Sequence, residues 1–453
     1  MSQLLITGTY IATVDASDSE IVSGWVAIDE NRIVGVGSDV IPADFATFQR
    51  VDGSGCLLTP GFVNTHHHLY QWATRGLATE STLFDWLVEL YPIWGHLDAD
   101  ITRAAAKGAL ASLMLSGCTY ASDHHYIFPR EGGDCLAAEI EAAQSLGIRF
   151  HPTRGSMDLG RSKGGLPPDH VVEDRDAILI ATESAITRFH DPAPESMVRI
   201  GVAPCSPFSV TTELMTEAAQ LARKHGVRLH THLAETIDED AFCKARFGCS
   251  PTDYVESLGW LGSDVWMAHS IHLDDSAVAK FGKTGTGVAH CPSSNARLGS
   301  GIARVQDLIR AGAPVGLGVD GAASNENGEL LTEVRAAALW ARLKDGPSAM
   351  SSREALRLAT MGGARVLGRE SDLGSIEVGK LADLALWRLD DIGHIDIVDP
   401  IAALVLGPKA SLKMLIVNGE KRVENGNLVN TSHREIANDA LAASKKMLAK
   451  AGR

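Results

Sequence analysis

The sequence lacks the features that mark disulfide-rich secreted proteins and membrane-spanning proteins. Its 453 residues include only seven cysteines and no C-x-x-C pair. A low, odd count argues against a disulfide framework and fits a reducing compartment. No window approaches the ~18 uninterrupted apolar residues of a spanning helix, and Met1–Ile6 has no basic region followed by an apolar stretch. We therefore expect a cytoplasmic protein with no membrane partner.

Positive charge is also scarce. Lysine and arginine number 41 against 56 aspartates and glutamates, which gives a formal net charge of −15 at pH 7. Such a surface repels a phosphate backbone, and no run of Lys or Arg offsets it, so we expect no nucleic-acid partner. Solubility alone explains a charge of this size.

The periodicity of the chain changes twice. Residues 1–58 read as short strands broken by turns, with a hairpin signal at Asp29–Asn31. From 59 to 368, short apolar runs alternate with helical stretches, as in a parallel sheet. Strand character returns at 369–433, where Asn418-Gly419 is a hairpin turn signal, and the polar Ala/Lys-rich segment 434–453 predicts a surface helical tail.

The central segment contains eight predicted strands, which is the number in a TIM barrel. They are Gly61–Asn64, Cys118–Asp123, Ile148–Arg154, Val198–Pro204, Val227–His232, Val265–His269, Gly287–Cys291 and Val315–Asp320. We therefore predict an α/β fold, a (β/α)8 TIM barrel with a small β-sandwich domain built from both chain ends.

Polar residues end nearly every predicted strand at its C-terminal edge, where TIM-barrel enzymes place their active sites. One polar strand end is unremarkable, but seven of eight are hard to assign to chance. The residues are His66 and His68, Asp123 to His125, Arg154, His232, His269, His290 and Asp320.

Four of these residues predict a metal site. His66 and His68 are alternate residues of one strand and can converge on one ion. His232 ends a second strand and Asp320 a third. Three imidazoles and one carboxylate suit Zn²⁺, which lowers the pKa of a bound water to about 7. Taken singly, each has a simpler explanation: a capped strand end for the histidines and a helix N-cap for Asp320.

Two further residues are candidates for proton transfer. Glu235 begins the loop after His232, where it can reach a metal-bound water rather than the ion. His269 ends the sixth strand, facing the same edge. As an isolated residue it would be a hydrogen-bonded core histidine, but beside a metal it becomes an electrostatic or proton-transfer partner.

The motifs Pro60–His68, His232–Glu235, His269, Gly318–Gly321 and Gly374–Leu384 together resemble the amidohydrolase superfamily, in the branch of guanine deaminase, cytosine deaminase and the triazine hydrolases. The resemblance covers essentially the whole chain. It implies a hydrolase with metal ligands His66, His68, His232 and Asp320. It also implies proton transfer by Glu235, His269 and Asp320. No lysine ends the fourth strand, so we expect one divalent metal, zinc or alternatively iron, rather than two.

Within that branch, Ser122–Tyr126, Arg154–Met157, Ala203–Phe208 and Cys291–Asn295 resemble the bacterial 8-oxoguanine deaminases. Guanine deaminases carry an arginine after the fourth strand, where this chain has Pro204–Pro207 and no cation. The resemblance therefore implies hydrolysis of 8-oxoguanine to urate and ammonia. The alternatives are a triazine ring like hydroxyatrazine, a pterin ring like isoxanthopterin, and a non-catalytic scaffold, which would be marked by lost ligands.

Substrate recognition is predicted from loop residues near the same edge. Gln71 and Tyr126 can hydrogen-bond ring carbonyls, and Trp94 lies in a long first connection that can fold over the mouth. The remaining candidates are His125, Arg154 and Ser206. For Trp94, packing between loop and barrel is an equal alternative. For Arg154, an ion pair with an acid is an equal alternative. We expect a small heterocyclic substrate and a homo-oligomer.

Overall fold

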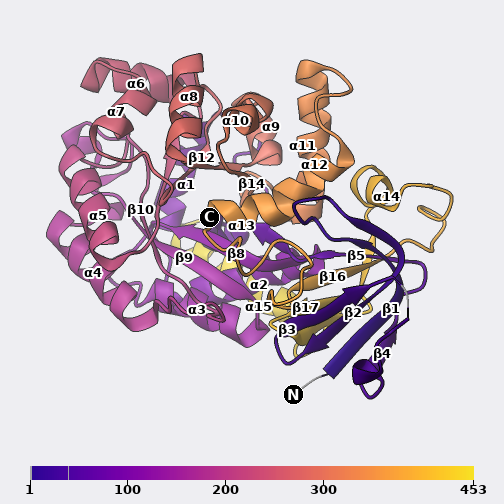
Figure 1. Ribbon diagram of the computed structural model, residues 1–453. Coiled ribbons are helices and arrows are strands. Elements are labelled where there is room, and N and C mark those ends of the chain that lie inside the picture. The colour runs from indigo at the N-terminus through magenta and orange to yellow at the C-terminus, as the bar shows by residue number, and fades with distance from the viewer. Residues whose placement is uncertain (1–2, 39) are drawn as a thin grey trace.

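The computed structural model describes residues 3–38 and 40–453, and its centre is a closed barrel of eight parallel strands (Figure 1). The strands follow one another around the barrel in chain order, and all eight predicted strands are present. They are β6 (Phe62–Asn64), β8 (Cys118–His125), β9 (Arg149–Ser156), β10 (Gly201–Pro204), β11 (Leu229–Leu233), β12 (Val265–His269), β13 (Gly287–His290) and β14 (Val315–Leu317).

Helices connect the strands and cover the outside of the barrel (Figure 1). Their sequences show why they form. In α5 (Thr212–His225), Leu214, Met215 and Ala218 point to the barrel, Thr211 caps the first turn, and Gly226 ends the helix at φ +65°. The others are α1 (Leu83–Trp94), α2 (Ala99–Leu115), α3 (Cys135–Leu146), α4 (Arg175–Phe189), α6 (Ile237–Phe247), α7 (Pro251–Ser257), α8 (Asp275–Thr284), α9 (Pro292–Arg297), α10 (Val305–Ala311), α11 (Leu330–Asp345), α12 (Ser352–Arg357) and α13 (Gly363–Val366).

The two chain ends build one β-rich domain beside the barrel, as predicted (Figure 1). It is a nine-stranded sheet that branches at β1, whose first half pairs with β4 and whose second half pairs with β5. The strands are β1 (Gln3–Ala12), β2 (Glu20–Asp29), β3 (Arg32–Gly37), β4 (Gln49–Asp52), β5 (Cys56–Pro60), β16 (Leu384–Arg388), β17 (Ser411–Val417), β18 (Glu420–Glu424) and β19 (Asn427–Leu428).

Both predicted hairpin turns occur in this sheet. Glu30 and Asn31 join β2 to β3, and Asn418 and Gly419 join β17 to β18. Asn418 and Gly419 both have positive φ, +54° and +76°, as the favoured two-residue hairpin turn requires. A Cβ on Gly419 would lie 1.8 Å from the carbonyl oxygen of Glu30, so only glycine fits where the two turns meet.

A buried ion pair and an aromatic contact join the barrel to the sheet. Arg149 of β9, with no exposed surface, donates to the carboxylate of Asp383 at 2.9 Å and to the side-chain oxygen of Asn418 at 2.6 Å. Trp387 of β16 packs on Phe62 of β6 with ring centroids 5.3 Å apart. These contacts link two barrel strands, β6 and β9, to the C-terminal part of the β-rich domain.

The C-terminal segment forms α15 (His433–Lys450), which lies against α2. Met447 is fully buried there, and Lys446 and Lys450 pair with Asp98, the N-cap of α2. In the described part of the chain, no helix is long and apolar enough to cross a membrane. The boundaries 1–58, 59–368, 369–433 and 434–453 stay a prediction, although β5 to β6 and α15 begin close to them.

Strand β14 ends earlier than predicted. It stops at Leu317, and Asp320 instead begins the two-residue strand β15 (Asp320–Gly321), which pairs with β7 (His67–His68). Asp320 has φ +63°, and its backbone N–H donates to the carbonyl oxygen of His66 at 3.1 Å. The chain therefore turns after the barrel strand and places this acid directly over the histidines of the first strand.

Candidate metal and active site

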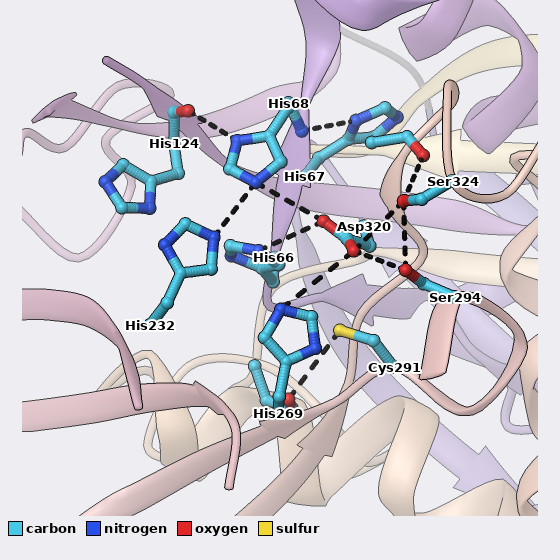
Figure 2. A network of polar contacts seen from close by, with 12 residues as sticks. His66, His67, His68, His124, His232, His269, Cys291, Ser294, Asp320 and Ser324 are labelled. Carbon is cyan, nitrogen blue, oxygen red and sulfur yellow. Dashed lines mark hydrogen bonds and ion pairs between the residues drawn. The ribbon is translucent and has the colours of Figure 1, made fainter. Parts of the chain in front are cut away.

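Three histidine side chains and one carboxylate converge at the C-terminal edge of the barrel (Figure 2). The Nε2 atoms of His66 and His68 both lie 3.3 Å from Oδ1 of Asp320, and the Nε2 atoms of His68 and His232 lie 3.1 Å apart. The ligand atoms of His66, His68 and Asp320 all lie within 4.8 Å of one another. All four residues are buried.

The hydrogen bonds on the far side of each ring decide which nitrogen carries the proton. His68 Nδ1 lies 2.7 Å from the carbonyl oxygen of His124, and His232 Nδ1 lies 2.7 Å from that of Cys205. Because a carbonyl oxygen only accepts, both Nδ1 atoms donate. The neutral rings therefore present unprotonated Nε2 atoms to one another.

The same reasoning applies to His66 through a fourth histidine. His230 Nδ1 donates to the carbonyl oxygen of Trp266 at 2.9 Å, so neutral His230 accepts at Nε2 from Nδ1 of His66, 2.8 Å away. This leaves Nε2 of His66 unprotonated, and it has no hydrogen-bond partner among the described residues. Three nitrogen lone pairs and a carboxylate thus face one point, an arrangement that repels itself unless a cation lies between them.

The electrostatics agree with this donor set. Burial lowers the pKa of His68 to about 4 and that of His232 to about 3, so both rings are neutral at pH 7. Burial also favours protonation of Asp320, but the neighbouring His66 and the charge of His269 hold its pKa well below the usual range. Neutral imidazoles and an ionised carboxylate are the forms that bind a divalent metal.

Two serines hold the other oxygen of Asp320. Ser294 Oγ donates to Oδ2 at 2.6 Å, and Ser324 Oγ lies 3.2 Å from the same atom and 2.9 Å from Ser294 Oγ (Figure 2). Oδ2 is thereby occupied, which leaves Oδ1 facing His66 and His68. Hydrogen bonds of this kind orient a metal ligand and are part of a working site.

Glu235 and His269 lie on the other side of Asp320. His269 Nε2 is 3.5 Å from Oε2 of Glu235 and 4.0 Å from Oδ2 of Asp320, and its Nδ1 donates to Asn295 at 2.9 Å. Burial raises the pKa of Glu235 to about 7. Burial opposes the charge on His269, but Glu235 and Asp320 raise its pKa above the ordinary value. Both groups can therefore exchange protons near neutral pH.

Backbone strain gathers at the same place. Ala234, His269, Ser270 and Asp320 all have φ between +50° and +66°, a region that costs a non-glycine residue energy. Each lies at or just after the end of a barrel strand. The strain turns the side chains of His269 and Asp320 toward the centre of the barrel mouth, where the other polar groups lie.

A cavity lies over these groups at the mouth of the barrel. Its polar lining is His68, Gln71, Tyr126, Cys205, His232, Glu235, His269, Asp320 and Ser324, and its apolar lining is Leu83, Trp86, Leu87, Tyr91, Phe208 and Leu298. Much of the apolar wall comes from α1, in the long connection between β6 and β8.

Comparison with known proteins decides the family. The family model described as "Amidohydrolase family" matches residues 57–422, the whole barrel and part of the β-rich domain. The chain belongs to the amidohydrolase family. This confirms the predicted family and makes the protein an enzyme that hydrolyses C–N bonds, as its curated relatives do.

Several named relatives match over nearly their full length. This amidohydrolase is 46% identical to 8-oxoguanine deaminase of Pseudomonas aeruginosa, covering 89% of this chain and 90% of that protein. It is 35% identical to hydroxydechloroatrazine ethylaminohydrolase of Pseudomonas sp. strain ADP, covering 99% and 96%. A crystal structure of a mutant atrazine chlorohydrolase from Arthrobacter aurescens TC1, complexed with zinc and atraton, matches with a TM-score of 0.93 at 35% identity, covering 97% and 100%.

Of the predicted substrate-binding residues, Gln71 and Tyr126 line the cavity of this amidohydrolase. Gln71 is buried, and neither its amide oxygen nor its amide nitrogen has a hydrogen-bond partner in the described structure. An amide in this position can donate and accept, which is what recognition of a heterocycle's carbonyl and N–H groups requires.

The other four candidates lie outside the cavity lining, and each polar group is engaged elsewhere. Trp94, the last residue of α1, donates to Thr74 at 3.1 Å and packs on the rings of Tyr70 and Trp86. His125 contacts Glu139 at 2.6 Å and the carbonyl oxygen of Ile127 at 2.8 Å. Arg154 pairs with Glu173 at 2.6 Å, and Ser206 bonds to Ser209 at 2.7 Å. These side chains keep their neighbours in place and have no free polar group facing the mouth.

Some functional neighbours were missed by sequence reasoning. His230 sets the tautomer of His66, and a signal was present, since His230-x-His232 repeats the spacing of His66-x-His68. Cys205 belongs to the cation-free segment Pro204–Pro207 that the sequence did single out; it lines the mouth, and its carbonyl oxygen accepts a hydrogen bond from His232. The first connection does fold over the mouth, but the side chains that line the cavity come from earlier in α1 than Trp94: Leu83, Trp86, Leu87 and Tyr91.

Proposed function

We propose that this amidohydrolase binds one divalent metal, zinc, through His66, His68, His232 and Asp320, and hydrolyses 8-oxoguanine to urate and ammonia. The observation that carries the proposal is a buried set of three unprotonated Nε2 atoms beside one carboxylate. Those of His66 and His68 lie 3.3 Å from Oδ1 of Asp320, and that of His232 lies 3.1 Å from that of His68. Three histidines and a carboxylate are a zinc donor set. Iron is the alternative metal for the same ligands.

The metal, when bound, lowers the pKa of a water to about 7 and so makes a nucleophile available at neutral pH. The remaining chemistry falls to three side chains. Asp320 accepts the proton of the attacking water. His269, 4.0 Å from Asp320 and 3.5 Å from Glu235, stabilises the negative charge that develops during attack.

Glu235 carries the proton that the ring and the leaving group need. With its pKa raised to about 7 by burial, it can be protonated at neutral pH and donate to a ring nitrogen. It then helps the exocyclic amine leave as ammonia. The overall reaction balances: 8-oxoguanine and water give urate and ammonia.

The choice of ring rests on two observations. The 46% identity to an 8-oxoguanine deaminase spans most of both chains. The segment after β10, Pro204–Pro207, brings Cys205 to the cavity and carries no cation, unlike guanine deaminases. Gln71 and Tyr126 then supply hydrogen bonds to the ring, because both line the same cavity.

A steady-state screen with zinc-loaded enzyme tests the proposal. Ammonia release is measured with 8-oxoguanine, guanine, isoxanthopterin and hydroxyatrazine, and urate is followed by absorbance. We expect 8-oxoguanine to have the highest kcat/KM. Glu235→Gln, which keeps the size of the side chain, is the matched variant: it should retain metal and lose kcat by at least ~10², the scale of a lost general acid–base.

A triazine or pterin ring is the second candidate. The chain is 36% identical to an isoxanthopterin deaminase over 92% of its length, and its fold matches triazine hydrolases. These enzymes share the family's framework, so pocket shape decides between rings. An equal or higher kcat/KM on isoxanthopterin or hydroxyatrazine would overturn the proposed substrate and leave the deaminase class intact.

A further inference from the structure

The turn that carries Glu235 is held by a second carboxylate, which has no part in the proposed reaction. Glu239 is fully buried, and each of its oxygens accepts one backbone N–H. Oε1 accepts from Ala234 at 2.9 Å and Oε2 accepts from Glu235 at 3.0 Å. One side chain thus accepts hydrogen bonds from two consecutive backbone N–H groups of the turn after β11.

The sequence around Glu239 is that of a helix capping box, used in an altered way. In Thr236-Ile237-Asp238-Glu239, Thr236 caps α6 and accepts the N–H of Glu239 at 3.4 Å. In a regular box the glutamate returns this bond to the N–H of the capping residue itself. Glu354 does so for Ser351 at the start of α12, at 2.7 Å. Glu239 instead reaches one and two residues further back.

The peptide of Ala234 connects the two turns that carry Glu235 and His269. Ala234 has φ +52°, and its carbonyl oxygen accepts the N–H groups of Ile271 and His272 at 2.9 and 3.0 Å. Its N–H goes to Glu239. Hydrogen bonds at both its N–H and its carbonyl oxygen keep Ala234 in this strained conformation. Loss of the bond from its N–H to Glu239 would allow the turn to relax.

We propose that Glu239 is a positioning residue, whose carboxylate fixes the Ala234–Glu235 backbone so that the carboxyl group of Glu235 stays beside His269, 3.5 Å away. The inference rests on the proposed role of Glu235 in proton transfer. Glu239 itself needs no contact with the substrate, since it does not line the cavity. Its effect passes through the backbone.

Glu239→Gln tests this directly, because glutamine has the same shape but turns an NH₂ group toward one of the two backbone N–H donors. We expect kcat to fall about 10- to 100-fold, the scale of a misplacement near 1 Å. KM should stay within about 3-fold, since Glu239 is outside the cavity, and metal content should be unchanged. Glu354→Gln, the same change in the regular capping box, is the control and should leave kcat at the wild-type value.

A second variant keeps the proposal testable if Glu239→Gln does not fold. Glu239→Asp keeps the charge but is one methylene too short to reach both N–H groups, so it should also lower kcat while retaining bound metal. Wild-type kcat in either folded, metal-loaded Glu239 variant would contradict the proposal.

A double-mutant cycle separates positioning from general structural damage. If Glu239 acts through Glu235, adding Glu239→Gln to Glu235→Gln should lower kcat by less than about 2-fold further, the usual limit for additivity. A further loss as large as that of Glu239→Gln alone would show that it acts elsewhere and overturn the proposal. Full activity in Glu235→Gln by itself would be a different result, contradicting the proposed function.

Discussion

Replacing Ser294 by alanine should weaken metal binding although all four proposed ligands remain. Ser294 Oγ donates to Oδ2 of Asp320 at 2.6 Å, a short bond to an ionised acceptor. Bonds to charged groups contribute about 1.5–3 kcal/mol, which corresponds to roughly 10- to 150-fold in an equilibrium constant. Loss of a group that orients a metal ligand costs about 10- to 100-fold in affinity in other sites, a range of the same size.

The structure also predicts that a second serine variant, Ser324→Ala, loses less zinc affinity than Ser294→Ala. Ser324 lies 3.2 Å from Oδ2 of Asp320 and shares its one proton between Asp320 and the carbonyl oxygen of Gly321. Ser324→Ala should therefore cost no more than about 1 kcal/mol, or roughly 5-fold in affinity.

Zinc affinity is measured by competition with a chromophoric chelator, using the purified full-length enzyme. We expect the affinity to fall from wild type to Ser324→Ala and further to Ser294→Ala, with kcat of the zinc-saturated variants reduced less than their affinity. Wild-type zinc affinity in Ser294→Ala would refute the argument that the Oδ2 contacts orient Asp320 toward the histidines.

Three further results are expected. Asp383→Asn should lower the free energy of unfolding in urea by about 3–5 kcal/mol, because it leaves a buried guanidinium unpaired. The same change at the half-exposed Asp264, which pairs with Arg223, should cost less than about 1 kcal/mol. Equal losses of stability in the two variants would contradict the argument from burial. Gln71→Ala and Tyr126→Phe should each lower kcat/KM roughly 3- to 100-fold without releasing metal, whereas Gln144→Ala on the exposed face of α3 should not. Wild-type kinetics in both pocket variants would assign ring recognition to other groups. Dialysis against a chelator should abolish activity and zinc should restore it, and full activity in metal-free enzyme would exclude the metal site.

The order of strands and the edge that carries the chemistry could be predicted from the sequence. Both depend on local rules: apolar runs of strand length alternate with helical stretches, and parallel strands bring their C-terminal ends to one edge. Side chains two residues apart share a strand face, which is why the spacing of His66 and His68 is enough to pair them. In the folded protein they meet His232 and Asp320 as this reasoning expects.

Substrate recognition could be predicted less well. Gln71 and Tyr126 line the cavity, but Trp94, His125, Arg154 and Ser206 do not. His125 and Arg154 do lie near the C-terminal ends of β8 and β9, at the correct edge. The direction in which such a side chain points depends on partners elsewhere in the chain, such as Glu173 for Arg154, and no local pattern encodes such a partner.

The sequence by itself determined the barrel, the β-rich domain and the residues able to bind a metal, because these follow from periodicity and from residue type at strand ends. Only the tertiary structure decided how those residues act. The proton on each histidine depends on a carbonyl or ring from another strand, as His230 shows for His66, 164 residues away. The reach of Glu239 past its own helix cap likewise depends on the strained turn at Ala234. Hydrogen bonds need the positions of both partners, and folding alone brings those partners together.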